Sequence, residues 1–161
     1  MKRFFLGGLV GVVVGALAAA LMILTAMPGM MLVVEPSRLG FDETVAALEK
    51  ALAEEGWSSP ATLDLNKSMA KHGVEFGPKV RVVQLCKPEY AKEVLTTDRQ
   101  VSALMPCSIA VYEGDDGRVY VSKMNTGLMG KLFGGTVAEV MGGKVAKDEA
   151  AILEPVVGGA N

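Results

Sequence analysis

Histidine and cysteine are scarce in this sequence, and their scarcity excludes several kinds of metal and disulfide site. The chain of 161 residues contains one histidine and two cysteines. A zinc site built from four cysteine and histidine ligands is therefore impossible, and the cysteines can form at most one disulfide. The formal net charge is −2. A chain with this net charge lacks the excess of positive charge that attracts nucleic acid, so we expect no nucleic-acid partner.

The sequence also lacks the short motifs that accompany common enzyme reactions. It contains no G-x-S-x-G, no H-E-x-x-H and no phosphate loop with a Gly-Lys-Ser/Thr ending. The glycines of "GLMGKLFGG" are not followed by that ending. Glu139 lies among apolar neighbours, but we expect it on a solvated helix face rather than as a buried acid. We assign no catalytic residue and expect a protein that is not an enzyme.

Charged residues are absent from the run Phe4 to Met27, which follows Lys2 and Arg3. A bilayer core needs about 20 apolar helical residues, so the run is long enough to span it. The run predicts a transmembrane anchor over residues 4–27, after a cytoplasmic basic stub over residues 1–3. A cleaved signal peptide is the alternative, but its apolar core usually has about 7–15 residues. We therefore favour an uncleaved anchor in the inner membrane, with the rest of the chain in the periplasm or exterior.

Small residues recur at every fourth position of this run, at Gly7, Gly11, Gly15 and Ala19. This spacing places them on one face of a helix, where backbones can approach closely and pack. The stripe predicts self-association of the anchor. The alternative is that glycine and alanine are simply common in membrane segments.

After a connector or first strand at residues 28–35, residues 36–157 have the patterns of one small domain, and residues 158–161 predict a flexible tail. A helix is predicted from Asp42, its N-cap, to Gly56, with Val45, Leu48 and Leu52 on its apolar face. Residues 61–65 suggest a strand, followed by a short helix or turn.

Further strands are predicted over residues 79–86, 107–112 and 118–123, the last two as a hairpin around "EGDDG". A helix begins at Pro88, and the chain after Gly127 is apolar and helical. The order predicts an α+β fold: a single small domain with a mixed, largely antiparallel sheet and helices on one face, preceded by one N-terminal transmembrane helix.

Two short motifs each contain a cysteine. The motif Cys86-Lys87-Pro88 joins a strand to a helix, and Pro106-Cys107 opens a strand that closes on "VYE". With these motifs the chain resembles, roughly from Pro36 to Val157, the bacterial and archaeal family catalogued as domain of unknown function number 302. The segment "SKMNTGLMGKLFGGTVAEVM" looks like a membrane-anchored or exported branch. The resemblance implies a compact α+β fold, often a homodimer, and no established activity. Lys87 stands where asparagine is frequent in that family.

Sulfur and imidazole side chains in the predicted domain suggest a site for haem or a soft metal. Thioether, thiolate and imidazole suit copper(I), and a His/Met pair also suits haem iron. The candidate cofactor-binding residues are His72, Cys86, Cys107 and Met105. The candidate metal ligands are His72, Cys107, Met69 and Met124. The alternatives are a histidine on the surface and methionines that fill a small core.

The cysteine pair has three interpretations. Each cysteine can be a small buried hydrophobic residue. The two can form a disulfide, which an oxidising compartment permits and which requires their Cα atoms within about 7 Å. They can also form a functional thiol site.

Three functions follow from these interpretations. The first is a membrane-anchored extracytoplasmic binding module, dimeric, that holds haem or copper. The second is a thiol–disulfide or sulfur-carrying protein that uses Cys86 and Cys107, with Lys87 lowering a thiolate pKa. The third is a structural domain that presents a surface to a protein partner.

Overall fold

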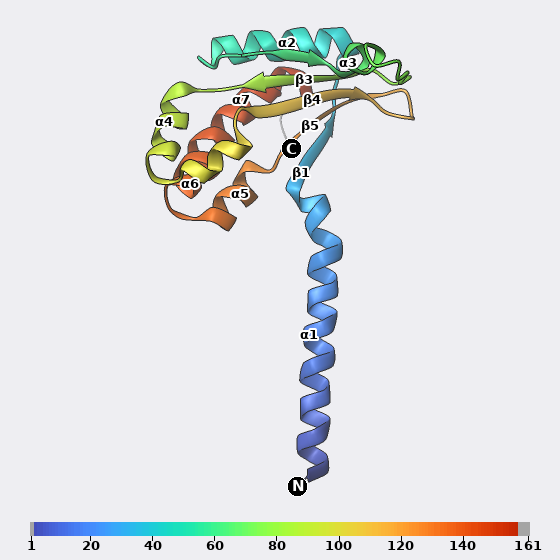
Figure 1. Cartoon of the computed structure of the whole chain (residues 1–161), viewed down its shortest axis with the longest axis vertical. Helices are drawn as coiled ribbons and strands as arrows, with labels where there is room; N and C mark the ends of the chain where they lie inside the picture. Colours follow the sequence, from blue (N-terminus) through green and yellow to red (C-terminus); the bar gives the residue numbers. More distant parts are fainter. Residues whose placement is uncertain (1, 158–161) are drawn as a thin grey trace. The chain divides into compact units, whose positions relative to one another are not determined.

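The computed structural model describes the backbone of residues 2–157 and the side chains of residues 14–25 and 29–157. It divides the chain into two compact units, Met1–Met31 and Leu32–Asn161. The first unit contains one helix, α1 (Lys2–Met31), and the second contains all strands and the remaining helices (Figure 1).

Helix α1 covers the run for which the sequence predicts a membrane anchor. Within the described residues, no helix is both long and apolar enough to cross a membrane. The side chains of anchor residues 4–13, 26 and 27 lie outside the described part of the chain. This range includes Gly7 and Gly11 of the predicted packing stripe. The other two members of the predicted packing stripe, Gly15 and Ala19, are exposed.

The second unit is built on a five-stranded sheet in the order β1-β5-β4-β3-β2, and every neighbouring pair is antiparallel. The predicted α+β class is confirmed, and the sheet is fully antiparallel rather than mixed. Figure 1 shows β3, β4 and β5 side by side through this unit. The strands are β1 (Leu32–Pro36), β2 (Thr62–Asp64), β3 (Val80–Leu85), β4 (Cys107–Glu113) and β5 (Val119–Met124).

The prediction of Asp42 as an N-cap is wrong: helix α2 (Phe41–Glu54) begins at Phe41 with Gly40 as its N-cap, and the Gly40 backbone N–H donates to the Glu43 side chain. Two other helices begin where local chemistry predicts. Asp64 accepts a hydrogen bond from the Lys67 backbone at the start of α3, and Pro88 is the first residue of α4. The helices are α2 (Phe41–Glu54), α3 (Leu65–Ala70), α4 (Pro88–Thr97), α5 (Thr126–Phe133), α6 (Gly135–Glu139) and α7 (Ala146–Val157), with a 3-10 helix η1 (Arg99–Leu104) and a π-helix η2 (Val140–Val145).

The apolar C-terminal stretch is divided into several helices because its glycines interrupt it. Gly134 and Gly135 have φ angles of 70° and 50°, a left-handed conformation that ends α5 and offsets α6. Gly130 and Gly142 then allow α5 and η2 to approach closely, since a Cβ added at Gly130 would lie 3.0 Å from the Gly142 backbone.

The core lies on one face of the sheet. Val83, Leu85 and Ile109 are fully buried there and pack in one cluster with Leu48 of α2 and Ile152 of α7. Full burial of such a side chain contributes about 1.5–3 kcal/mol. The apolar face predicted for the first helix of this domain is confirmed, since Val45, Leu48 and Leu52 are all buried.

Candidate functional site

The two cysteines lie at the same end of the sheet. Leu85 and Cys107 are directly opposite partners on β3 and β4, and Cys86 follows Leu85 at the end of its strand. Both thiols are free and half-buried. The disulfide interpretation therefore does not describe this structure, although the sequence correctly placed both cysteines at strand ends.

Two adjoining pockets meet around Cys107. The first encloses about 30 Å³, room for roughly one water molecule, and is lined by Cys86, Met105, Cys107 and Met141 among apolar neighbours. The second has a volume of about 410 Å³ and includes Cys107, Met141 and Met124. Two cysteines and three methionines thus line the two pockets.

An unusual helix positions Met141 in both pockets. The residue lies in η2, a π-helix that leads directly into α7, and its side chain is 7% exposed. π-helical turns are rare and frequently occur at functional sites. Met141 was not among the candidate ligands predicted from the sequence.

Two consecutive acids at the start of α7, Asp148 and Glu149, each accept a hydrogen bond from a half-buried lysine. Asp148 accepts hydrogen bonds from Lys87 Nζ at 2.7 Å, Trp57 Nε1 at 3.0 Å and Tyr90 Oη at 3.2 Å. Burial opposes ionisation of Asp148, but the hydrogen bonds from Lys87 and Trp57 outweigh it, so the pKa of this carboxyl lies below its ordinary value. The charge of Lys87 is therefore paired with Asp148.

Glu149 forms the second pair on the other side of the site. Its Oε2 accepts hydrogen bonds from Lys123 Nζ at 2.7 Å and from Thr126 Oγ1 at 2.9 Å. The Glu149 side chain is 3% exposed and that of Lys123 is 13% exposed. All three residues line the larger pocket with Cys107, so this pocket has a charged and hydrogen-bonded floor beside its sulfur atoms.

The environment of Cys107 keeps its thiol protonated at neutral pH. Burial, together with the negative charge of Glu149, raises the pKa of Cys107 to about 11. A thiol with this pKa reacts slowly as a nucleophile. The proposed thiol exchange, which needs a lowered thiolate pKa, therefore receives no support from Lys87 or from the surroundings of Cys107.

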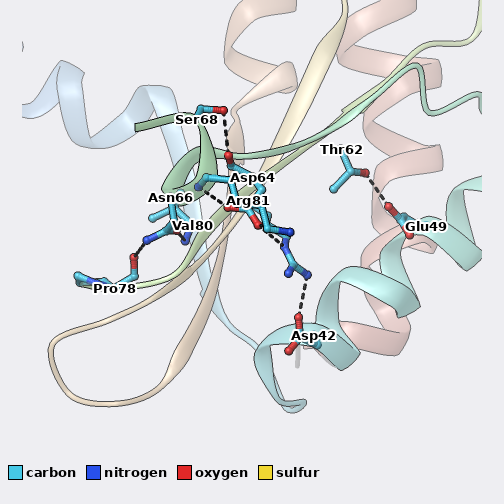
Figure 2. Close-up of polar contacts among 10 residues, drawn as sticks. Asp42, Glu49, Thr62, Asp64, Asn66, Ser68, Pro78, Val80 and Arg81 are labelled. Carbon is cyan, nitrogen blue, oxygen red and sulfur yellow. Dashed lines mark hydrogen bonds and ion pairs between the residues drawn. The ribbon is translucent and has the colours of Figure 1, made fainter. Parts of the chain in front are cut away.

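His72 and Met69 lie at the opposite end of β3. Asp64, the N-cap of α3, forms an ion pair with Arg81 near the start of β3, and Asn66 accepts a hydrogen bond from the Val80 backbone (Figure 2). His72 follows this helix and is exposed. Arg81, near the start of β3, and Cys86, just after its last residue, are five residues apart, which corresponds to a distance of roughly 17 Å between the two ends of the strand.

The structure therefore brings together only part of the predicted site. Cys86 and Met105 share the smaller pocket with Cys107, and Met124 shares the larger one with it. His72 and Met69 line neither pocket. Among the described residues, no group of three or more His, Cys, Asp or Glu side chains could hold a metal ion. A metal at this site would need methionine thioethers in its ligand set.

Sequence reasoning did not identify the two lysine–carboxylate pairs. The spacing of α7 contained a signal for Glu149, because Ile152, Leu153 and Val156 are buried at three, four and seven residues after it. Glu149 therefore occupies the apolar stripe of an amphipathic helix. Glu139, which the sequence singled out, is exposed as expected.

The fold and site define a small antiparallel α+β domain with a sulfur-lined pocket between two lysine–carboxylate pairs. A family model described as "Domain of unknown function DUF302" matches residues 33–155, and the chain belongs to this family. Its structure is similar to the crystal structure of an uncharacterised conserved protein of this family from Bacillus stearothermophilus. The TM-score is 0.69 at 21% identity, over 78% of this chain and 98% of the other. No curated protein matches the chain.

Proposed function

We propose that this protein is a membrane-anchored extracytoplasmic module that binds copper(I) through sulfur ligands. The observation that carries the proposal is that two adjoining pockets are lined by Cys86, Met105, Cys107, Met124 and Met141. Copper(I) is a soft ion that prefers thiolate and thioether ligands. The site offers both kinds in a small and mostly apolar space.

Cys107 is the central ligand in this proposal because it lines both pockets. It would bind as a thiolate, so copper binding releases its proton. Met141 lines the same two pockets and would supply a thioether. Lys123 and Glu149 remain paired with each other beside the site. They hold the pocket lining in position and do not contact the metal.

Copper has better support than haem as the ligand. Haem ligation by the candidate residues depends on the imidazole of His72, which is exposed at the other end of β3. A copper ion requires only a few converging sulfur atoms.

The anchor and its orientation are supported by the sequence. A charge-free run follows Lys2 and Arg3, and such an arrangement places the N-terminus in the cytoplasm. A fusion of alkaline phosphatase to the C-terminus tests this, because that enzyme needs disulfides that form outside the cytoplasm. We expect an active fusion in the membrane fraction. An inactive fusion, or one in the soluble fraction, would contradict the anchored orientation.

The copper proposal is tested on the full chain in detergent, without oxygen. The protein is mixed with excess copper(I), separated by gel filtration and analysed for bound metal. We expect about one copper per chain in the wild type and strongly reduced retention in Cys107→Ser and Met141→Leu. Met69→Leu is the matched control, since this methionine lies in α3 away from both pockets. Equal retention in all variants would refute the assigned ligand set.

A further inference from the structure

Helix α5 ends in an exposed apolar tip. Its last two residues, Leu132 and Phe133, are 57% and 48% exposed, and the exposed Lys131 precedes them. Gly134 and Gly135 then turn the chain, and a Cβ added at either would meet nothing within 4 Å. We call these five residues the α5 tip. They end "GLMGKLFGG", the segment that lacks the ending of a phosphate loop.

The body of α5 holds the tip in place. The Leu128 backbone N–H donates a hydrogen bond to Asn125 Oδ1 at 3.0 Å, which caps the start of the helix. Further along, Gly130 lies so close to η2 that an added Cβ would be 3.0 Å from the Gly142 backbone. Side chains on a rigid support lose little conformational entropy when they bind. The α5 tip is therefore presented to its surroundings at a low entropic cost.

The charge of the α5 tip is positive. No aspartate or glutamate occurs between Asp116 and Glu139. Lys131 is the only charged residue of α5, and among the residues that the structure describes it forms no ion pair. Exposed leucine and phenylalanine beside lysine are typical of segments that lie at the surface of a bilayer. The lysine complements the negative charge of anionic lipids.

The α5 tip belongs to the end of the sheet at which the chain leaves the proposed anchor. Leu32, the first residue of β1, directly follows α1 and is the register partner of Met124, the last residue of β5. Helix α5 begins two residues later, at Thr126, and has eight residues (Figure 1). The path from Leu32 across the strand pair and along α5 therefore limits the distance to the tip to roughly 25 Å.

The size of the α5 tip fits a lipid surface better than a protein partner. Three side chains that are about half exposed present on the order of 300 Å², whereas a stable protein interface buries about 800 Å² on each side. A tethered domain needs no such area, because its anchor already holds it beside the bilayer at a high effective concentration. A small apolar tip with one lysine is then sufficient.

We propose that the α5 tip inserts Leu132 and Phe133 into the surface of the anchoring membrane, with Lys131 at the level of anionic lipid headgroups. This inference rests on the anchor in the proposed function and is independent of copper binding. The contact holds the domain against the bilayer. It also brings the larger sulfur-lined pocket close to the membrane, because Leu32 and Met124 line that pocket.

The test uses the metal-free full chain in vesicles of phosphatidylcholine with about one third phosphatidylglycerol. Phe133→Trp places a fluorescent reporter at the tip, and its emission is the difference from the wild type, whose only tryptophan, Trp57, is 6% exposed. Lipids brominated on their acyl chains quench an inserted indole by contact. We expect brominated vesicles to remove at least about half of the reporter emission.

Phe76→Trp is the matched control. Phe76 is also 48% exposed, but it precedes β3 at the end of the strand opposite to Cys86, so its reporter should keep its emission. In the Phe133→Trp background, Lys131→Gln should lower the quenching in anionic vesicles to the level found in pure phosphatidylcholine. Circular dichroism checks the fold of each variant, and Leu132→Trp is a second reporter at the tip.

Flotation of the vesicles separates this proposal from the anchor. A chain that floats with the vesicles while neither tip reporter is quenched overturns the proposal and leaves the anchor standing. Equal quenching of the Phe76→Trp reporter overturns it as well. So does a tip reporter that is shielded from aqueous iodide but not quenched by brominated lipid, because a protein then covers the tip. A chain that does not float lacks the anchor, and the proposal falls with it.

Discussion

Replacing Glu149 by glutamine removes the negative charge of a buried ion pair while nearly preserving the volume of the side chain. Lys123 then keeps its charge at 13% exposure without the carboxylate 2.7 Å away. Loss of one partner from a buried pair costs about 3–5 kcal/mol. We expect the lower end of this range, because the glutamine oxygen can still accept the hydrogen bond from Thr126.

Thermal unfolding followed by fluorescence measures this loss directly. Trp57 is the only tryptophan in the chain and is 6% exposed beside the site, so its emission reports on unfolding of the domain. A loss of about 3 kcal/mol should lower the melting temperature by on the order of 10 °C. The double variant Glu149→Gln/Lys123→Met should recover much of it, since it leaves no unpaired charge.

The same substitution should make Cys107 more reactive. Burial raises the pKa of this thiol to about 11, and Glu149 contributes to the increase. With the carboxylate removed and Lys123 still charged, the pKa falls, and each unit of decrease raises the thiolate fraction about tenfold at a fixed mildly alkaline pH. Alkylation by iodoacetamide, followed by mass spectrometry, should therefore accelerate. A variant with wild-type melting temperature and wild-type alkylation would refute the role of the pair.

Three further predictions concern packing, pH and the metal. Gly130→Ala should cost about 1–3 kcal/mol in thermal unfolding, because its Cβ would meet backbone atoms of η2 at 3.0 Å, whereas a Cβ at Gly143 meets nothing within 4 Å and Gly143→Ala is the control. Equal melting temperatures would contradict this. Asp148 has a lowered pKa, so its stabilisation is present above its ordinary pKa and is lost as the pH falls through the lowered one. Acid titration should destabilise the wild type more than Asp148→Asn, and parallel curves would argue against the contribution of this carboxylate. His72→Ala should leave copper retention unchanged, and a loss of bound copper would return the imidazole to the ligand set.

Local patterns were sufficient to predict most of the elements. The helix with Val45, Leu48 and Leu52 on one face, the hairpin around "EGDDG" and the helix begun by Pro88 all depend on interactions within a few residues. The segmentation of the C-terminal stretch could not be predicted in this way. It depends on the left-handed conformations of Gly134 and Gly135 and on packing between α5 and η2.

The site depended on contacts between distant parts of the chain. The sequence placed Cys86 and Cys107 at strand ends, and their meeting follows from the register of β3 and β4. The pairs Lys87–Asp148 and Lys123–Glu149 join residues 61 and 26 positions apart, so no local pattern reveals them. His72 was selected for its chemistry alone, and the attachment of α3 to the other end of β3 separates it from the sulfur atoms.

Competition for copper(I) between the full chain and a colorimetric chelator decides whether the sulfur-lined pockets bind the metal. We expect the wild type to withdraw about one copper(I) per chain from the chelator. Cys107→Ser and Met141→Leu should withdraw much less, while Met69→Leu should match the wild type. A wild-type protein that withdraws no copper, or a Cys107→Ser variant that withdraws as much as the wild type, would contradict the proposed copper site.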